Sequence, residues 1–430
     1  MEFPTLESYL SLPSNSTSQP NPPIVSLDED SHEFVTAPPS ISPPIVIGTR
    51  NSRLALVQAE LVRKLFEISH PNHPTTIQSM STAGDQNQGR PLYLMGGKSL
   101  WTKELEVALL EGSVDLIVHC LKDMPTSLPP GCELGAILER EDPRDALVIR
   151  RDLPFRSLSE LPAGSVIGTS SVRRVAQLRR RFPQLKFQDI RGNLNTRFRK
   201  LDAPDSPYTG IVLAVAGLNR LECADRISSY LSPPELYYAV GQGAIGIEIR
   251  SRAEEGEVTP RASQRTETVR QLVKSLEHWP TALVCHAERS LLRTLEGGCS
   301  VPVGVTSTLL PLPMPCQWAP QARLTLTGVV TSVDGTKEVM VTKTADIYGP
   351  KDSIKLGCEL AAELLEAGAD EILEELNVVK EAAGDGTEET EISRIGAVEA
   401  KTHIQIAAPA DSERTMIGAN ETHSTISIKA

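Results

Sequence analysis

The sequence of residues 165–201 is SVIGTSSVRRVAQLRRRFPQLKFQDIRGNLNTRFRKL, and its pattern indicates the fold class. The apolar run SVIGT predicts a buried strand, and VRRVAQLRRR after it has the apolar spacing of an amphipathic helix. Ser170 and Ser171 are suited to cap the start of that helix. Because LKFQDI predicts a further strand, the stretch gives the strand–helix–strand unit that is typical of an α/β domain.

The same stretch is strongly basic in a chain that is acidic overall. The 31 residues from Ser170 to Lys200 contain ten Arg or Lys and one acid, Asp189, although the formal net charge of the chain is −12. A helix N-terminus favours anions, and arginines in its first turn add forked donors for carboxylate or phosphate. The cluster therefore predicts a site for a small, multiply charged anion.

The basic cluster has two other possible interpretations, a solvated helix face and a nucleic-acid surface. A solvated helix face accounts for single arginines, and Arg179 and Arg199 are assigned to it. A nucleic-acid surface would require a broadly basic domain and a docking module, and neither is evident.

The composition describes a soluble chain with polar ends. At 430 residues, with 40% hydrophobic residues, the chain is long enough for two or three domains. Residues 1–43 contain eight Pro, nine Ser and no Lys or Arg, so they predict a disordered extension without the basic residues of a targeting peptide. Residues 380–430 predict a second disordered tail. No apolar run reaches the roughly 20 residues that a membrane span requires.

Neither the cysteines nor the histidines form a ligand pattern. The seven cysteines include no CxxC, and the eight histidines show no HExxH spacing. We therefore expect reduced thiols, no disulfide framework and no structural metal.

Alternating strand and helix patterns extend along most of the chain. PIVIGTR, TTIQSM and VDLIVH predict strands, with a helix at 52–68 whose Leu54, Leu61 and Leu65 face inward. A second α/β unit begins near Ala146, and a third unit with strands such as RLTLTGVV spans about 281–379. Ligands on open α/β sheets bind at the carboxyl ends of strands. The residues that fall there are Arg50, Lys122, Asp123, Ser170, Arg173 and Arg191.

Gly241–Gly246, GQGAIG, matches the dinucleotide template G-x-G-x-x-G. That fingerprint needs a helix after the glycines, whereas AIGIEIR predicts a strand, which disfavours nucleotide binding. Two other loops carry reactive groups: LKDMP contains Lys122 and Asp123, and LEGGCSVPVG contains Cys299. Taken alone, Asp123 could be a turn residue and Cys299 an inert thiol.

The strings and their order resemble the porphobilinogen deaminase (hydroxymethylbilane synthase) family. The matching strings include GTRNSRLALVQA, GGKSLWTKELE, VHCLKDMP, EREDPRDA, GTSSVRR, RGNLNTR, YAVGQGAIGIE and AERSLLRTLEGGCSVPVG. The resemblance implies an α/β fold of three domains. The first two are doubly wound and like periplasmic binding proteins around a cleft, and the third is a small α+β domain. The boundaries are 44–142 plus 240–278 for domain 1, 143–239 for domain 2 and 279–379 for domain 3.

The resemblance also implies an enzyme of heme biosynthesis that condenses four porphobilinogens head to tail into hydroxymethylbilane, with release of four ammonia. A dipyrromethane cofactor would be attached through a thioether to Cys299, and Asp123 would be catalytic together with Lys122. The other implied cofactor-binding residues are Lys98, Ser170, Arg173, Arg174, Arg191 and Arg220. The implied substrate-binding residues are Arg50, Ser52, Arg197, Ser171, Trp101 and Gln242.

This chemistry agrees with the basic cluster, because each porphobilinogen carries an acetate and a propionate. Two positions depart from the family pattern: Trp101 replaces the usual phenylalanine and Cys120 the usual serine. The rival functional class is a non-catalytic, hinge-type anion-binding protein, which would need neither Cys299 nor Asp123. We expect a cytoplasmic monomer whose partners are porphobilinogen and the growing polypyrrole, with no membrane or nucleic-acid partner.

Overall fold

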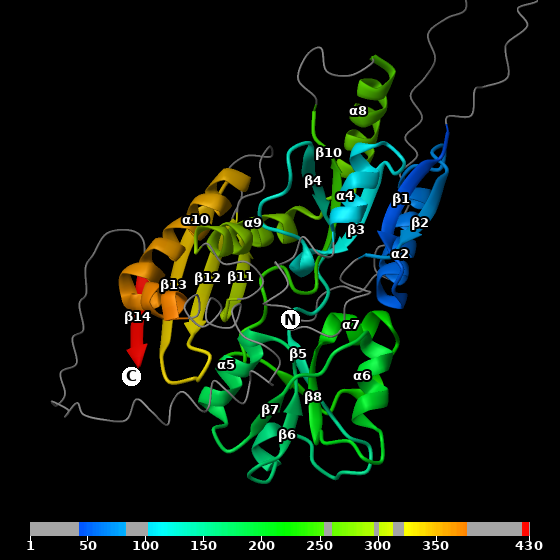
Figure 1. The fold of residues 1–430 in the computed structure, drawn as a ribbon. Helices are drawn as coiled ribbons and strands as arrows, with labels where there is room; N and C mark the ends of the chain where they lie inside the picture. The colour runs from blue at the N-terminus through cyan, green and yellow to red at the C-terminus, as the bar shows by residue number, and fades with distance from the viewer. Residues whose placement is uncertain are drawn as a thin grey trace, which may run out of the picture. The chain divides into compact units, whose positions relative to one another are not determined.

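The strands of the computed structural model form three sheets (Figure 1). The structure describes residues 43–82, 102–252, 260–295, 301–312, 322–375 and 424–429. Lys98, Trp101 and Cys299 lie outside the described residues. Among the residues described, no helix is both long and apolar enough to cross a membrane.

The first sheet has the strand order β2-β1-β3-β10-β4. β1 pairs in parallel with β2 and β3, whereas β10 is antiparallel to both β3 and β4. Apolar side chains of the strands and of the covering helices, such as Ile47, Phe66 and Ile247, form its core. The strands are β1 Ile45–Arg50, β2 Thr75–Met80, β3 Leu116–Cys120, β4 Cys132–Ile137 and β10 Ile245–Arg250, and the helices are α2 Arg53–Ser69, α4 Lys103–Leu110, α8 Pro260–Lys274 and the short 3₁₀ helix η3 Leu121–Asp123.

The second sheet repeats this plan with the order β7-β6-β8-β5-β9. β6 is parallel to β7 and β8, and β5 is antiparallel to its neighbours β8 and β9. Its elements are β5 Asp145–Ile149, β6 Val166–Gly168, β7 Lys186–Gln188, β8 Gly210–Ala214, β9 Ser229–Leu231, α5 Val172–Arg181, α6 Leu194–Leu201, α7 Val215–Arg220, η4 Leu158–Glu160 and η5 Ala224–Arg226. The chain crosses between the two sheets twice, from β4 to β5 and from β9 to β10. The expected pair of doubly wound units is therefore confirmed.

The third sheet is antiparallel, with the order β11-β12-β13-β14. Helices α9 and α10 pack together, and Gly357 allows their close approach because a Cβ there would lie 2.1 Å from the carbonyl oxygen of Ala287. This sheet and its helices confirm the small third α+β unit. Its elements are β11 Val303–Pro311, β12 Ala322–Thr331, β13 Glu338–Ile347, β14 Ser424–Lys429, α9 Trp279–Thr294, α10 Pro350–Leu364 and the π-helical η6 Leu365–Ala369.

The described part of the chain departs from three details of the expectations. The buried apolar face of α2 consists of Ala59, Val62 and Phe66, while Leu61 and Leu65 lie at its margin. β14 is a strand within a segment that the composition predicts to be disordered. Arg179, expected on a solvated face, donates to the carbonyl oxygen of Val333 at 3.1 Å, because the C-terminal turn of α5 packs against the β12–β13 connection.

Candidate active site

A cavity of about 500 Å³ is lined by residues from the two doubly wound units, and we call it the main cavity. Its volume lies within the range of about 300–1,000 Å³ that is usual for small-molecule sites. The lining comes from segments that follow strands β1, β3, β6, β7 and β8, as expected for open α/β sheets. From these segments the lining includes Arg50, Ser52, Lys122, Asp123, Ser170, Arg174, Arg191, Arg197 and Arg220.

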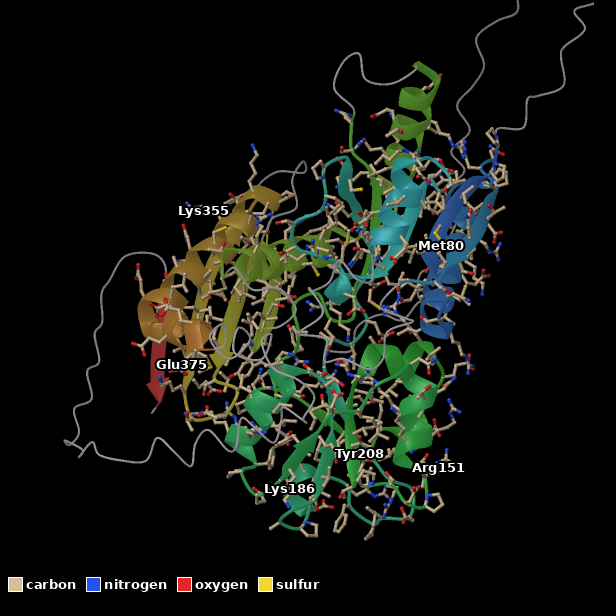
Figure 2. All side chains as sticks on the ribbon, viewed as in Figure 1. Met80, Arg151, Lys186, Tyr208, Lys355 and Glu375 are labelled. Atoms are coloured by element: carbon tan, nitrogen blue, oxygen red, sulfur yellow. The ribbon has the colours of Figure 1, made fainter. Side chains whose placement is uncertain are left out.

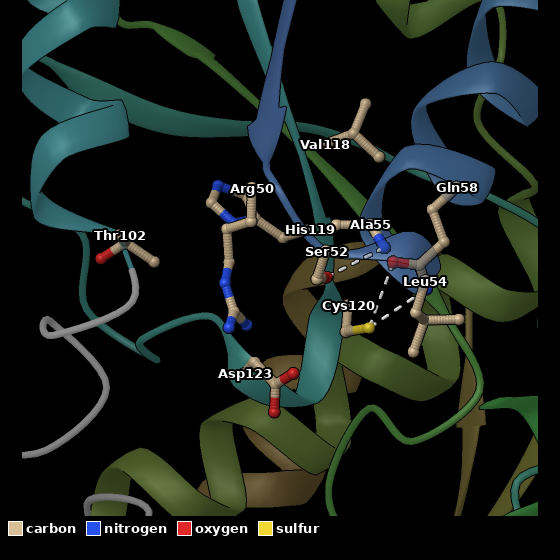
Figure 3. Close-up of a pocket in the computed structure, with 10 residues that line it drawn as sticks. All are labelled: Arg50, Ser52, Leu54, Ala55, Gln58, Thr102, Val118, His119, Cys120 and Asp123. Carbon is tan, nitrogen blue, oxygen red and sulfur yellow. Dashed lines mark hydrogen bonds between the residues drawn. The ribbon is translucent and has the colours of Figure 1, made fainter. Parts of the chain in front are cut away.

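A smaller pocket of about 60 Å³, the side pocket, adjoins the main cavity. The two share Arg50, Ser52, Leu54, Cys120 and Asp123. In Figure 3, the Arg50 side chain extends from the end of β1 toward the turn that carries Asp123. Asp123 therefore lies where the two spaces meet.

The lining of the main cavity is strongly cationic. It contains Arg53 in addition to the six predicted cations, while Asp123 is its one carboxylate among the described residues. Burial, together with the nearby charge of Arg174, lowers the pKa of Arg197 to about 10. Burial also lowers the pKa of Lys122, opposed by the charge of Asp123. A cavity with these properties favours an anionic ligand, because its charge would compensate the mutual repulsion of the cations.

Backbone contacts hold several of these cations in place. Arg197 Nε donates to the carbonyl oxygen of Gly192 at 2.9 Å, and Arg220 Nη2 donates to that of Gly243 at 2.6 Å. Arg191 Nε pairs with Asp189 Oδ2 at 2.8 Å. Tyr208, labelled in Figure 2, donates its hydroxyl to the carbonyl oxygen of Asp189 at 2.6 Å and so fixes the start of this loop.

The predicted serines have distinct positions. Ser52 caps α2 by accepting a hydrogen bond from the backbone N–H of Ala55 at 3.3 Å. Ser171 caps α5 in the same way, while Ser170 Oγ donates to the carbonyl oxygen of Ile190 at 2.7 Å. The sequence offered both serines as possible caps of this helix, and in the structure Ser171 is the cap. Ser171 does not line the main cavity.

Arg173 and Arg174 are both buried and share one carboxylate, Asp145, which the sequence did not single out. Arg173 Nη1 lies 2.8 Å from Asp145 Oδ2 and donates to the carbonyl oxygen of Tyr237 at 2.5 Å. Arg174 lines the main cavity, but Arg173 does not. Gln242 also lies behind the lining, and its Nε2 donates to Asp145 Oδ1 at 3.0 Å. Asp145 lies within the string EREDPRDA, but no pattern of residue types in the sequence pairs it with Arg173 or Arg174.

Cys120, which replaces the family's usual serine, faces Gln58 of α2 (Figure 3). Its Sγ lies 3.1 Å from Gln58 Nε2 and 3.2 Å from Oε1. Burial raises the pKa of the Cys120 thiol, and the charge of Asp123 raises it further. The thiol is therefore protonated near neutral pH and is a poor nucleophile.

A second missed cluster ties both crossover segments to the third unit. Arg140 of the first crossover donates to both carboxylate oxygens of Glu288 on α9, at 2.7 and 3.0 Å. Gly241 N of the second crossover donates to Glu288 Oε2 at 2.8 Å. Arg140 Nε also donates to the carbonyl oxygen of Gln242 at 2.8 Å, so the two crossovers contact each other directly.

The glycines of GQGAIG serve this crossover and not a nucleotide. Gly243 has φ +91°, and a Cβ there would lie 2.2 Å from the carbonyl oxygen of Glu141. Strand β10 follows the glycines, as expected, and no helix begins there. The tight contact between the crossovers thus explains Gly243.

Comparisons with known proteins identify a family for this chain. A family model described as "Porphobilinogen deaminase, dipyromethane cofactor binding domain" matches residues 45–257. A second, "Porphobilinogen deaminase, C-terminal domain", matches residues 282–366.

Individual relatives cover most of the chain. A porphobilinogen deaminase from Yarrowia lipolytica is 44% identical over 341 residues, which is 78% of this chain and 94% of the relative. One from Kluyveromyces lactis is 49% identical over 339 residues, 78% of this chain and 97% of the relative. Among solved structures, the periplasmic aliphatic sulphonate binding protein SsuA from Escherichia coli has a TM-score of 0.31 and 12% identity, and covers 59% of this chain and 76% of that chain.

The family models and the relatives' identity over nearly their whole length lead to one conclusion. The chain belongs to the porphobilinogen deaminase family, transferases that polymerise porphobilinogen into hydroxymethylbilane and carry a dipyrromethane cofactor-binding domain.

Proposed function

We propose that the main cavity is where this chain carries out the family's reaction, with its cations holding carboxylates and Asp123 acting on the pyrrole. Four porphobilinogens are joined head to tail, four ammonia are released, and the product is hydroxymethylbilane. The observation that carries the proposal is the lining itself, in which one carboxylate, Asp123, lies among seven cationic side chains of the described residues. Every pyrrole unit brings an acetate and a propionate, so a growing chain needs this excess of cations.

The residues present fit a dipyrromethane cofactor. Its carboxylates match the buried Arg174 and the partly buried Arg197 and Arg220 in the cavity wall. Pairing with a ligand carboxylate would offset the desolvation that lowers the pKa of Arg197 and of Arg220. When bound, the cofactor supplies the pyrrole carbon to which the first substrate is joined. The residues proposed to hold it are Cys299, through a thioether, and Lys98, Ser170, Arg173, Arg174, Arg191 and Arg220.

The substrate-binding residues are proposed to be Arg50, Ser52, Ser171, Arg197, Trp101 and Gln242. Arg50 and Ser52 line both the main cavity and the side pocket next to Asp123, which supports a role beside the reacting ring. Arg173, Ser171 and Gln242 lie behind the lining. Arg173 can reach a ligand only after its ion pair with Asp145 opens.

Asp123 is proposed to stabilise the positive charge that develops on a pyrrole when ammonia leaves, and to accept and return protons at the pyrrole nitrogen. A carboxylate in the wall of a cavity lined by guanidinium groups suits this role, because it places a negative charge beside a pyrrole that the arginines hold by its carboxylates. Lys122 Nζ lies 3.4 Å from Gln242 Oε1, so the crossover segment helps to hold the turn that presents Asp123.

We also propose that the enzyme is a cytoplasmic monomer without a nucleic-acid partner. The cations of the described residues gather in one cavity rather than along a surface stripe, which does not favour a nucleic-acid polymer. The five cysteines within the described residues are free thiols, which suits a reducing compartment.

Single-turnover kinetics of Asp123→Asn test the proposal, together with the intact mass of the protein-bound intermediates. The amide keeps the size of the side chain but removes its charge. We expect cofactor and substrate still to bind, while the rate falls about 10²- to 10³-fold, as when one preorganised electrostatic contact is lost. Asp152→Asn, in an exposed ion pair with Arg150, is the matched control and should be unaffected. A near-normal rate in Asp123→Asn would show that Asp123 is only a turn residue.

A further inference from the structure

Asp145, the first residue of β5, lies at the centre of a buried polar cluster behind the main cavity. Its side chain is 1% exposed. Asp145 Oδ1 accepts hydrogen bonds from Arg174 Nη2 at 2.6 Å and Nε at 3.1 Å, and Oδ2 lies 2.8 Å from Arg173 Nη1. Burial alone would raise the pKa of Asp145, but the two guanidinium groups outweigh it and hold that pKa well below its usual range.

These contacts fix the direction of the Arg174 side chain. Besides the two bonds to Asp145, Arg174 Nη1 donates to the carbonyl oxygen of Val212 at 2.7 Å. A guanidinium has five N–H donors, so these three bonds fix the plane of the group and leave two N–H groups for other partners. Since Arg174 lines the main cavity, the remaining donors are held at its wall.

The cluster also reaches the turn that carries the proposed catalytic residues. Gln242 Nε2 donates to Asp145 Oδ1 at 3.0 Å and to the carbonyl oxygen of Pro143 at 2.7 Å. Gln242 Oε1 in turn faces Lys122 Nζ at 3.4 Å, and Lys122 adjoins Asp123. Asp145 is thus connected to the carboxylate-binding arginines on one side and, through Gln242, to the Lys122–Asp123 turn on the other.

We propose that Asp145 is a positioning residue for the reaction: it holds the Arg174 guanidinium ready for a ligand carboxylate and, through Gln242, aligns Lys122. The inference rests on the proposed role of Arg174 in carboxylate binding. Without the Asp145 charge, two buried guanidinium groups would lie beside each other with no counter-ion, and their repulsion would turn Arg174 away from its present direction. The cavity would keep its cations, but the Arg174 guanidinium would no longer be oriented to bind a ligand carboxylate.

The test compares Asp145→Asn with the matched control Asp152→Asn, whose carboxylate is exposed. We expect a smaller fraction of the protein to carry the cofactor, measured by intact mass after incubation with porphobilinogen. We also expect KM of the loaded fraction to rise about 100-fold, as when a binding group is displaced by about 1 Å, with a much smaller change in kcat. A merely structural role predicts a lower unfolding temperature and fewer active molecules, with KM unchanged, and that result would overturn the proposal.

Two further variants, Asp145→Glu and Arg174→Leu, distinguish a positioning role of Asp145 from misfolding and from a failure of the proposed role of Arg174. If Asp145→Asn does not fold, Asp145→Glu carries the test, because it retains the buried charge and moves its oxygens by one methylene. An unchanged KM in the Glu variant would then refute positioning. Arg174→Leu separates the two claims. Normal cofactor loading in Arg174→Leu would refute the proposed function of Arg174, whereas impaired loading there with normal KM in Asp145→Asn would refute only the role of Asp145.

Discussion

Replacing Glu288 with Gln tests how the third unit is held to the crossovers between the two doubly wound units. Glu288 is fully buried and accepts hydrogen bonds from Arg140 and from the backbone N–H of Gly241. It also accepts a hydrogen bond from Ser307 Oγ at 3.2 Å. Burial alone would lower the pKa of Arg140, but the charge of Glu288 outweighs it and raises that pKa. Gln fills nearly the same volume, so the substitution removes the charge without leaving a cavity.

The expected cost follows from the loss of a buried counter-ion. Breaking one partner of a buried ion pair typically costs about 3–5 kcal/mol, because the other charge is left uncompensated. With an m-value of about 3 kcal/mol/M or more, this cost corresponds to a decrease on the order of 1 M in the urea midpoint. Urea unfolding followed by circular dichroism measures the change. Asp346→Asn, in an exposed pair with Arg323, is the control. A Glu288→Gln midpoint no lower than that of the control would refute the argument.

Two further outcomes are expected. Removing residues 1–42 together with everything after about Glu381 should leave turnover nearly unchanged, because the composition of both segments is too polar to build a core; a large loss of turnover would contradict this. The truncation also removes β14, so any loss of stability should come from the third sheet. The second outcome concerns the stability of the folded protein at acidic pH. The pKa of Asp145 is depressed in the folded protein, so its contribution to stability is complete above the unfolded-state pKa of about 3.9 and is lost as pH falls through the folded-state value. Urea unfolding from about pH 5 to about pH 2 should therefore show a steeper decline for the wild type than for Asp145→Asn, and equal slopes would contradict it.

Local patterns predicted the elements that bring the site together. The stretch around α5 has both an amphipathic period and serines before its first turn, and the structure begins the helix at Val172 with Ser171 as its cap. Strands such as β1 and β3 are continuous apolar runs, so their ends, with Arg50 and Asp123, could be placed at one edge of the sheet. The predicted cations of the described residues line one cavity for this reason, apart from Arg173.

Contacts between distant parts of the chain could not be predicted in this way. Asp145 meets Arg174 across 29 positions and Gln242 across 97, and nothing in DALVI marks its first residue as a counter-ion. The Arg140–Glu288 pair spans 148 positions. The prediction for the inward face of α2 was partly right. Leu61 and Leu65 pack at the margin of the core, but the buried apolar positions are Ala59, Val62 and Phe66, because a 3.6-residue period also permits neighbouring faces.

Intact mass spectrometry of the purified protein shows whether it carries a covalent dipyrromethane. If the cavity holds a covalent dipyrromethane, the wild-type mass should exceed the sequence mass by two linked pyrrole units. Cys299→Ala should lose that added mass and all turnover. Cys120 lines the main cavity, and Cys120→Ala should retain the added mass. A wild-type protein that is fully active at its unmodified sequence mass would show that the reaction does not depend on a covalent dipyrromethane.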